Sequence, residues 1–109
     1  MHVGVSMYEV SFLPQGATVT AALSVANTAV LVALSAWPDP KTGGVRVVLD
    51  TPTIAFMAWG DAAVTATTAS LPLLPGSVEA FSLPLSATHV SIICPGSIGN
   101  AYVTQGRGA

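Results

Sequence analysis

Hydrophobic and polar residues alternate along much of this chain. In Val45–Asp50, every second residue from Val45 is aliphatic, while the other positions include Arg46 and Asp50. A period of two residues is typical of a β-strand with one buried face. Similar stretches recur at intervals of about 8 to 12 residues, which indicates a sandwich or barrel of short strands. The predicted strands are residues 5–13, 18–25, 29–35, 45–50, 54–59, 63–67, 78–83, 88–94 and 101–104.

Segments rich in proline and glycine separate these strands. Trp37–Gly44 contains two prolines and two glycines, so we predict a loop there. Thr51–Thr53 is short enough to join the strands at 45–50 and 54–59 as a hairpin. Leu71–Gly76 is expected to be extended and then to turn, because residues that precede proline avoid the helical conformation.

The pattern as a whole predicts an all-β fold, a jelly-roll-like β-sandwich or barrel of about eight short strands. The 109 residues are enough for one modest core but not for two, so residues 1–109 are expected to form a single domain. The last residues, 105–109, include two glycines and are expected to form a short frayed tail.

Ala21–Trp37 is uncharged, which makes a helix, or even a membrane span, the alternative to two strands. The segment is shorter than the roughly 20 apolar residues that a span needs, and it contains Ser24 and Asn27. It also lacks flanking lysine or arginine anchors. Its β-branched residues and the break at Asn27 favour two strands, so no membrane partner is expected.

The segment 54–59 is apolar on both faces. A strand with two apolar faces is buried on both sides, either within one fold or between subunits. We place its even-numbered residues, such as Phe56, in the core, and Met57 and Trp59 at a contact with another subunit. Other aromatic residues are added to this contact as anchors. The predicted interface residues are Met57, Trp59, Trp37 and Tyr102.

The composition supports self-association. Hydrophobic residues make up 51% of the chain and charged residues 7%, whereas a typical domain has about 25% charged residues. Because soluble monomers rarely expose large apolar patches, we expect other copies or another protein to cover much of the surface. The net charge of −2 provides no basic stripe for nucleic acid.

No catalytic or metal-binding constellation stands out. His89 would need Asp61 or Glu79 beside it to form an acid–base pair or a metal site. Cys94, the single cysteine, rules out an intrachain disulfide and is expected to be a buried, unreactive side chain. Positions 89 and 94 also differ by an odd number, so they fall on opposite strand faces. We therefore predict no enzyme activity, no cofactor and no metal.

The aromatic residues leave one alternative open. Trp37, Trp59, Tyr8 and Tyr102 could form a platform on which sugars stack, as on carbohydrate-binding sandwiches. A groove lined by these rings would favour a carbohydrate- or receptor-binding module, whereas a flat apolar patch that buries them would favour a structural protein.

Several motifs in the second half of the chain form a familiar series. They are AWGDAAV at 58–64, LPLLPGSVEAFS at 71–82, ATHVSII at 87–93 and AYVTQGRG at 101–108. The chain from Val45 onward thereby resembles small virion structural proteins that tailed bacteriophages encode near their capsid genes. It departs from them in having more alanine and fewer charges, and its first third is similar only in being rich in threonine and valine.

The resemblance implies a capsid decoration (cement) or head-associated protein, a compact β-sandwich on the exterior of the virion. Its expected partners are the major capsid protein and further copies of itself, as a trimer in preference to a dimer. Such proteins have no enzymatic residues to carry over. A carbohydrate- or receptor-binding module of a phage tail is the alternative.

Overall fold

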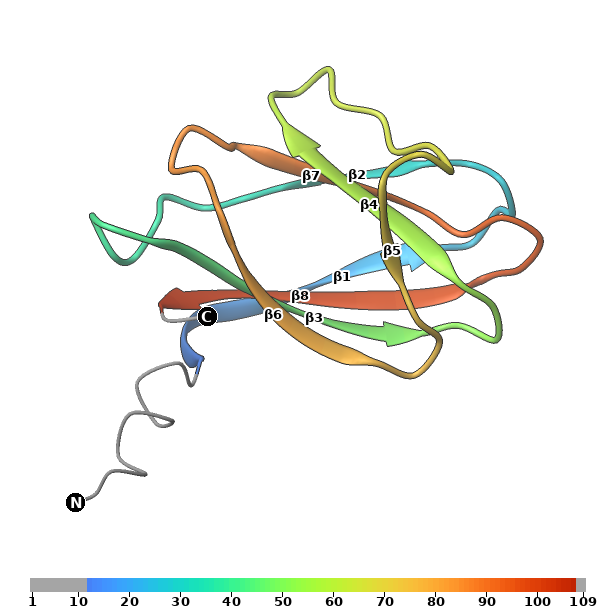
Figure 1. Ribbon diagram of the computed structural model, residues 1–109, viewed down its shortest axis with the longest axis horizontal. Coiled ribbons are helices and arrows are strands. Elements are labelled where there is room, and N and C mark those ends of the chain that lie inside the picture. The colour runs from blue at the N-terminus through green and yellow to red at the C-terminus, as the bar shows by residue number, and fades with distance from the viewer. Residues whose placement is uncertain (1–11, 108–109) are drawn as a thin grey trace.

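The computed structural model describes residues 12–107, which form eight strands and no helix (Figure 1). This confirms the predicted all-β fold. The strands are β1 (Leu13–Leu23), β2 (Val30–Ala33), β3 (Gly43–Asp50), β4 (Ala55–Gly60), β5 (Leu71–Leu73), β6 (Val78–Leu83), β7 (His89–Ile93) and β8 (Gly99–Arg107).

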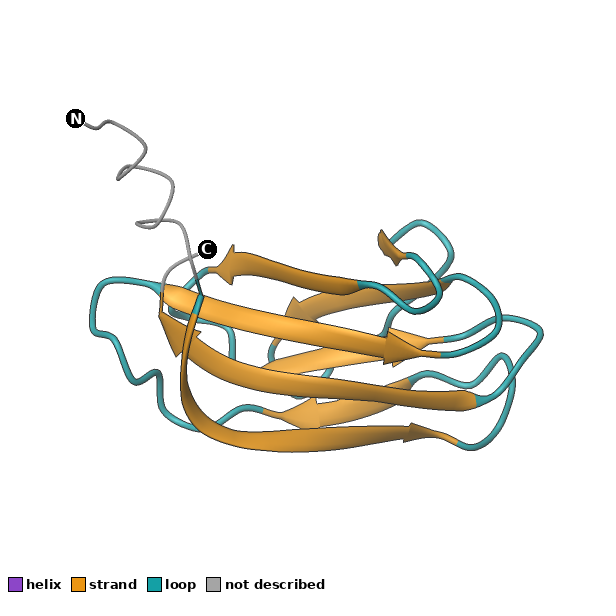
Figure 2. Ribbon diagram, turned by 90° about the horizontal axis from the view of Figure 1, so that it is seen from below, coloured by secondary structure: helices purple, strands orange, loops and turns teal. Residues whose placement is uncertain are grey.

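The strands form two four-stranded antiparallel sheets packed face to face (Figure 2). The first sheet has the order β1-β8-β3-β6, and the second has the order β2-β7-β4-β5. Apart from the β4–β5 connection, each link between consecutive strands crosses from one sheet to the other, giving the strand order of a jelly roll. Both sheets keep free edges, so the fold is a sandwich and not a barrel.

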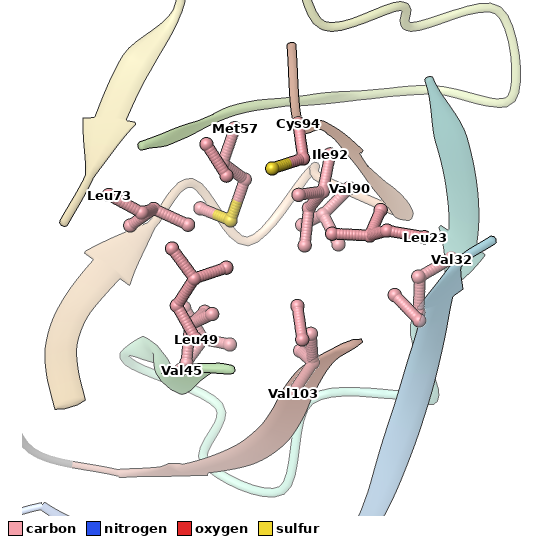
Figure 3. Packing of buried hydrophobic residues seen from close by; sticks show 14 of the residues in the cluster. Leu23, Val32, Val45, Leu49, Met57, Leu73, Val90, Ile92, Cys94 and Val103 are labelled. Atoms are coloured by element: carbon pink, nitrogen blue, oxygen red, sulfur yellow. The ribbon is translucent and has the colours of Figure 1, made fainter. Parts of the chain in front are cut away.

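The core fills the space between the sheets. In the first sheet it includes Val45 and Leu49, and in the second sheet Val90 and Ile92, with Cys94 just beyond the end of β7 (Figure 3). These residues occupy the alternate positions that the sequence pattern places inward, which confirms those assignments. Cys94 is buried, as predicted.

A turn at Asn27 and a close backbone contact at Gly99 connect the strands at one end of the sandwich. Asn27, in the turn between β1 and β2, has a φ of 63°, and asparagine tolerates this left-handed conformation better than most residues. The Asn27 side-chain oxygen accepts a hydrogen bond of 3.0 Å from the backbone amide of Gly96. The backbone amide of Asn27 donates a hydrogen bond of 3.3 Å to the Cys94 carbonyl. Nearby, Gly99 at the start of β8 lies so close to the Asp50 carbonyl that a side chain there would collide with it.

The predicted hairpin between residues 45–50 and 54–59 is wrong. β3 pairs with β6 and β8 in the first sheet, whereas β4 pairs with β5 and β7 in the second. The short link at Thr51–Thr53 therefore crosses the sandwich. A period of two shows which residues share a face, but it does not show which strand lies alongside.

Two further predictions differ from the structure. Residues 63–67 form part of a loop, and the strand lies at β5 instead. The tail is ordered as far as Arg107, because β8 pairs with both β1 and β3 up to Gly106 or beyond. Residues 108–109, and the strand predicted at 5–13 apart from its last two residues, lie outside the described residues.

The model also bears on the alternative of a membrane span. None of residues 12–107 belongs to a helix long and apolar enough to cross a membrane. The segment Ala21–Trp37 instead contains the end of β1, the turn at Asn27 and all of β2.

Candidate interaction surfaces

Met57 does not lie on the surface, so its predicted place at a subunit contact is wrong. Its side chain is 0% exposed and points between the sheets, in the cluster that also contains Leu49 and Leu73 (Figure 3). The two faces of β4 are therefore reversed relative to the prediction: Ala55 and Met57 face the core, and half-buried Phe56 faces outward. Because both faces of β4 are apolar, hydrophobicity alone could not distinguish them.

The other three predicted interface residues lie in separate places. Trp37, in the β2–β3 connection, packs against the core, and its indole Nε1 donates a hydrogen bond of 3.2 Å to the Ala87 carbonyl. Trp59, near the end of β4, is 40% exposed. Tyr102 is half-buried on the outer face of the first sheet, between Thr20 and Val48 on the neighbouring strands. The three rings therefore do not share one platform.

The outer face of β4 and β7 is covered in part by the chain itself. Ser91 points to that face, yet it is only 1% exposed. The amide of Ala66, which is also buried, donates a hydrogen bond of 2.9 Å to the Ser91 hydroxyl. The loop 61–70 thus lies against the second sheet. Sequence reasoning missed this role of Ser91, although a serine flanked by inward-facing apolar residues on a strand is a signal for a polar contact on the opposite face.

Internal hydrogen bonds give the loop 61–70 a defined shape. The Asp61 carboxylate accepts a hydrogen bond of 2.8 Å from the Ala63 amide. The amide of Thr67 donates to the Ser70 hydroxyl at 3.0 Å, and the Ser70 amide donates to the Thr67 carbonyl at 2.9 Å. These contacts assign Asp61 and its neighbours a structural role.

The outer face of the first sheet is mainly polar and carries an unusual arginine. The hydroxyls of Thr18 and Thr104 share a hydrogen bond of 2.7 Å, and Arg46 lies opposite Thr104 on the next strand. The Arg46 guanidinium carbon is 5.7 Å from the centre of the Phe12 ring, a cation–π distance. Its Nε atom is buried and has no hydrogen-bond partner among residues 12–107.

Among the groups considered for catalysis, His89 lies opposite Gly60, the neighbour of Asp61, whereas Cys94 lies beyond the other end of β7. The Nδ1 atom of His89 is 2.9 Å from the Thr88 hydroxyl. The Cys94 thiol is 3.1 Å from the Ser97 hydroxyl, which in turn is 2.6 Å from that of Thr53. This thiol–hydroxyl cluster connects two turns at one end of the sandwich. Within residues 12–107, no group of three His, Cys, Asp or Glu side chains is placed to hold a metal ion.

Large hydrophobic side chains are exposed over the described part of the chain, while charges are few. The exposed large hydrophobic residues are Leu13, Val19, Val25, Leu31, Ile54, Trp59, Leu71, Leu74, Val78, Leu85 and Ile98. The charged residues between positions 12 and 107 are Asp39, Lys41, Arg46, Asp50, Asp61, Glu79 and Arg107. None of these charges lies on β1, on β2 or in the turn that joins them.

Comparison of the chain with models of protein families, with curated proteins and with solved structures gives no match. The exposed surface of the sandwich is therefore the basis for the functional proposal.

Proposed function

We propose that this protein is a capsid decoration (cement) protein of a tailed bacteriophage, bound to the exterior of the virion. In this role it contacts sister subunits and the major capsid protein through apolar surfaces and adds strength to the shell. The observation that carries the proposal is the excess of exposed large hydrophobic side chains over charged ones. The motifs of the second half of the chain, with their resemblance to virion proteins, supply the choice of partner.

The surface is suited to adhesion. A stable contact buries about 800 Å² on each partner. The accessible surface here is 5729 Å², which is large enough for contacts with both a sister subunit and the capsid. Burial of apolar area contributes about 25 cal/mol per Å² and depends little on salt. The jelly-roll strand order occurs in viral capsid proteins and in lectins, so it agrees with this role without selecting it.

Reconstitution on phage heads tests the proposal. The protein is added to heads assembled from the major capsid protein that is encoded nearest to it, and the particles are imaged by cryo-electron microscopy. We expect additional density at symmetry-related positions on the outside of the shell, and dissociation of the shell at a higher temperature. Heads that bind no protein at micromolar concentration would overturn the proposal.

A carbohydrate- or receptor-binding tail module is the second candidate, and one observation favours it. Tyr102 lies on the outer face of the first sheet, and on the same face Asn100 is opposite Asp50. An aromatic ring beside amide and carboxylate groups is a combination suited to binding a sugar. Glycan-array binding that Tyr102→Ala abolishes, without binding to phage heads, would support this candidate instead.

A further inference from the structure

The sandwich has four edge strands, and they differ in how well they are protected. β2 and β5 are short, with four and three residues. β6 has six residues and carries Glu79. β1 has eleven residues and no charge, and within residues 12–107 it has a hydrogen-bonded neighbour, β8, on one side only. A long uncharged edge strand offers its free backbone groups to another strand, and proteins usually guard such edges with charges, prolines or bulges.

Protection of β1 is confined to its beginning. Pro14 lies there, and the register with β8 shifts between Pro14 and Thr18. From Thr18 to Leu23 the pairing with β8 is regular, and from Thr18 to Ala22 the side chains are small or β-branched. This second half of β1 is therefore a straight, unguarded edge that another strand can approach closely.

Side chains along this edge also lack a cover. Val19 alternates with the buried residues Ala21 and Leu23 and so lies on the inner face of the sheet, yet it is 43% exposed. An additional strand beside β1 would cover Val19 and use the free backbone groups at once.

We infer that β1 pairs antiparallel with β1 of a second copy about a two-fold axis, which joins the two first sheets into one continuous sheet of eight strands. A register centred on Thr20 aligns Thr20 with its counterpart, Val19 with Ala21, and Thr18 with Ala22. Side chains of directly opposed residues point to the same side of the sheet. Val19 therefore packs beside Ala21 of the second copy, on the face that also carries Ala21 of its own strand. This inference rests on the self-association that the proposed function requires, and it specifies the contact and the dimer.

A second copy is the occupant that the edge fits best. In the centred register every cross-strand pair between Thr18 and Ala22 is threonine with threonine, valine with alanine, or threonine with alanine. No pair opposes like charges, and none buries a charge without a counterpart, because the edge from Leu13 to Leu23 has none. Contacts built on edge strands are small, so we expect a dimer that dissociates on dilution in roughly the micromolar range.

A matched pair of charge substitutions tests the edge. Thr20 and Val78 are both exposed and lie at opposite ends of one row of side chains across the first sheet, on the edge strands β1 and β6. Thr20→Lys brings two like charges together at the two-fold axis, whereas Val78→Lys changes the other edge. By sedimentation velocity over a dilution series, we expect Thr20→Lys to weaken the dimer at least tenfold and Val78→Lys to leave it unchanged. Circular dichroism confirms that both variants remain folded.

A cross-link tests the register independently. Directly opposed residues of antiparallel strands have Cα atoms about 4.5–5.5 Å apart, within the range that a disulfide spans. We expect Thr20→Cys to form a covalent dimer under mild oxidation, with reduction restoring the monomer on a denaturing gel. Val78→Cys, with the same number of thiols, should stay monomeric there. The native Cys94 is buried and provides a common background.

The outcomes separate this inference from the proposed function. A wild-type monomer at 100 µM or a trimeric mass would overturn the edge dimer, and so would a dimer that survives Thr20→Lys without cross-linking through Thr20→Cys. Retained binding to phage heads in any of these cases would leave the proposed function in place. Conversely, an edge dimer that fails to bind phage heads would support the inference and contradict the proposed function.

Discussion

Replacement of Met57 by alanine should destabilise each subunit without weakening the contact between subunits. Met57 is 0% exposed, and the change removes three heavy atoms from its side chain. Each methylene-sized group contributes about 0.8 kcal/mol, so the loss of burial alone amounts to about 2.4 kcal/mol. The cavity left between Leu49 and Leu73 adds to this. We therefore expect the free energy of unfolding to fall by about 2–4 kcal/mol, within the range for methionine-to-alanine changes in cores.

Urea denaturation, followed by circular dichroism, measures this change. With a slope of about 1–3 kcal/mol per molar urea, the midpoint should fall by at least about 0.7 M while the slope stays constant. Both proteins must be compared at several equal concentrations, because the proposed dimerisation would raise apparent stability at high concentration. Met57→Leu is the matched control. It keeps the volume nearly constant and should cost less than about 1.5 kcal/mol.

Two results would refute this reasoning. A loss of less than about 0.5 kcal/mol for Met57→Ala is typical of a surface position and would contradict the buried placement. Dissociation of the dimer with the stability of the subunit unchanged would return Met57 to a subunit contact, as the sequence pattern alone suggests.

Three further substitutions probe the connections around the core. Ser91→Ala leaves the buried Ala66 amide without its acceptor. We therefore expect the free energy of unfolding to fall by about 1–3 kcal/mol in urea denaturation, with faster proteolysis within residues 61–70. An unchanged rate of cleavage would contradict the anchoring role of Ser91. Cys94→Ala should cost roughly 1 kcal/mol, and the native thiol should react slowly with a thiol reagent, whereas rapid labelling would show that it is exposed. Gly99→Ala forces a side chain against the Asp50 carbonyl, so we expect the free energy of unfolding to fall by about 1–3 kcal/mol. An unchanged melting temperature in thermal unfolding would contradict this expectation.

The alternation of residues determined the faces of most strands without any knowledge of the fold. Val45, Leu49, Val90 and Ile92 are inward in the structure, as the period of two predicts. Successive side chains of a strand point to opposite sides, so this information is local. Where one face is polar and the other apolar, the local pattern also shows which face is buried.

Where both faces are apolar, only the tertiary structure decided the outcome. β4 could have placed either Phe56 or Met57 inward, and packing between the sheets selected Met57. The loop at 61–70, anchored through Ser91, then supplied part of the cover for the other face. Such a cover comes from residues distant in sequence, and no local period records it.

Strand partners were decided in the same way. β3 and β4 are adjacent in sequence and joined by a short link, yet they lie in different sheets. The partners of β3 are instead β6 and β8, whose pairing with it spans long stretches of chain. The uncharged sequence of β1 could be read directly, but its position at an edge follows from this pairing. Pairing depends on how all the apolar faces are buried together, so the alternation of residues within a single strand does not contain it.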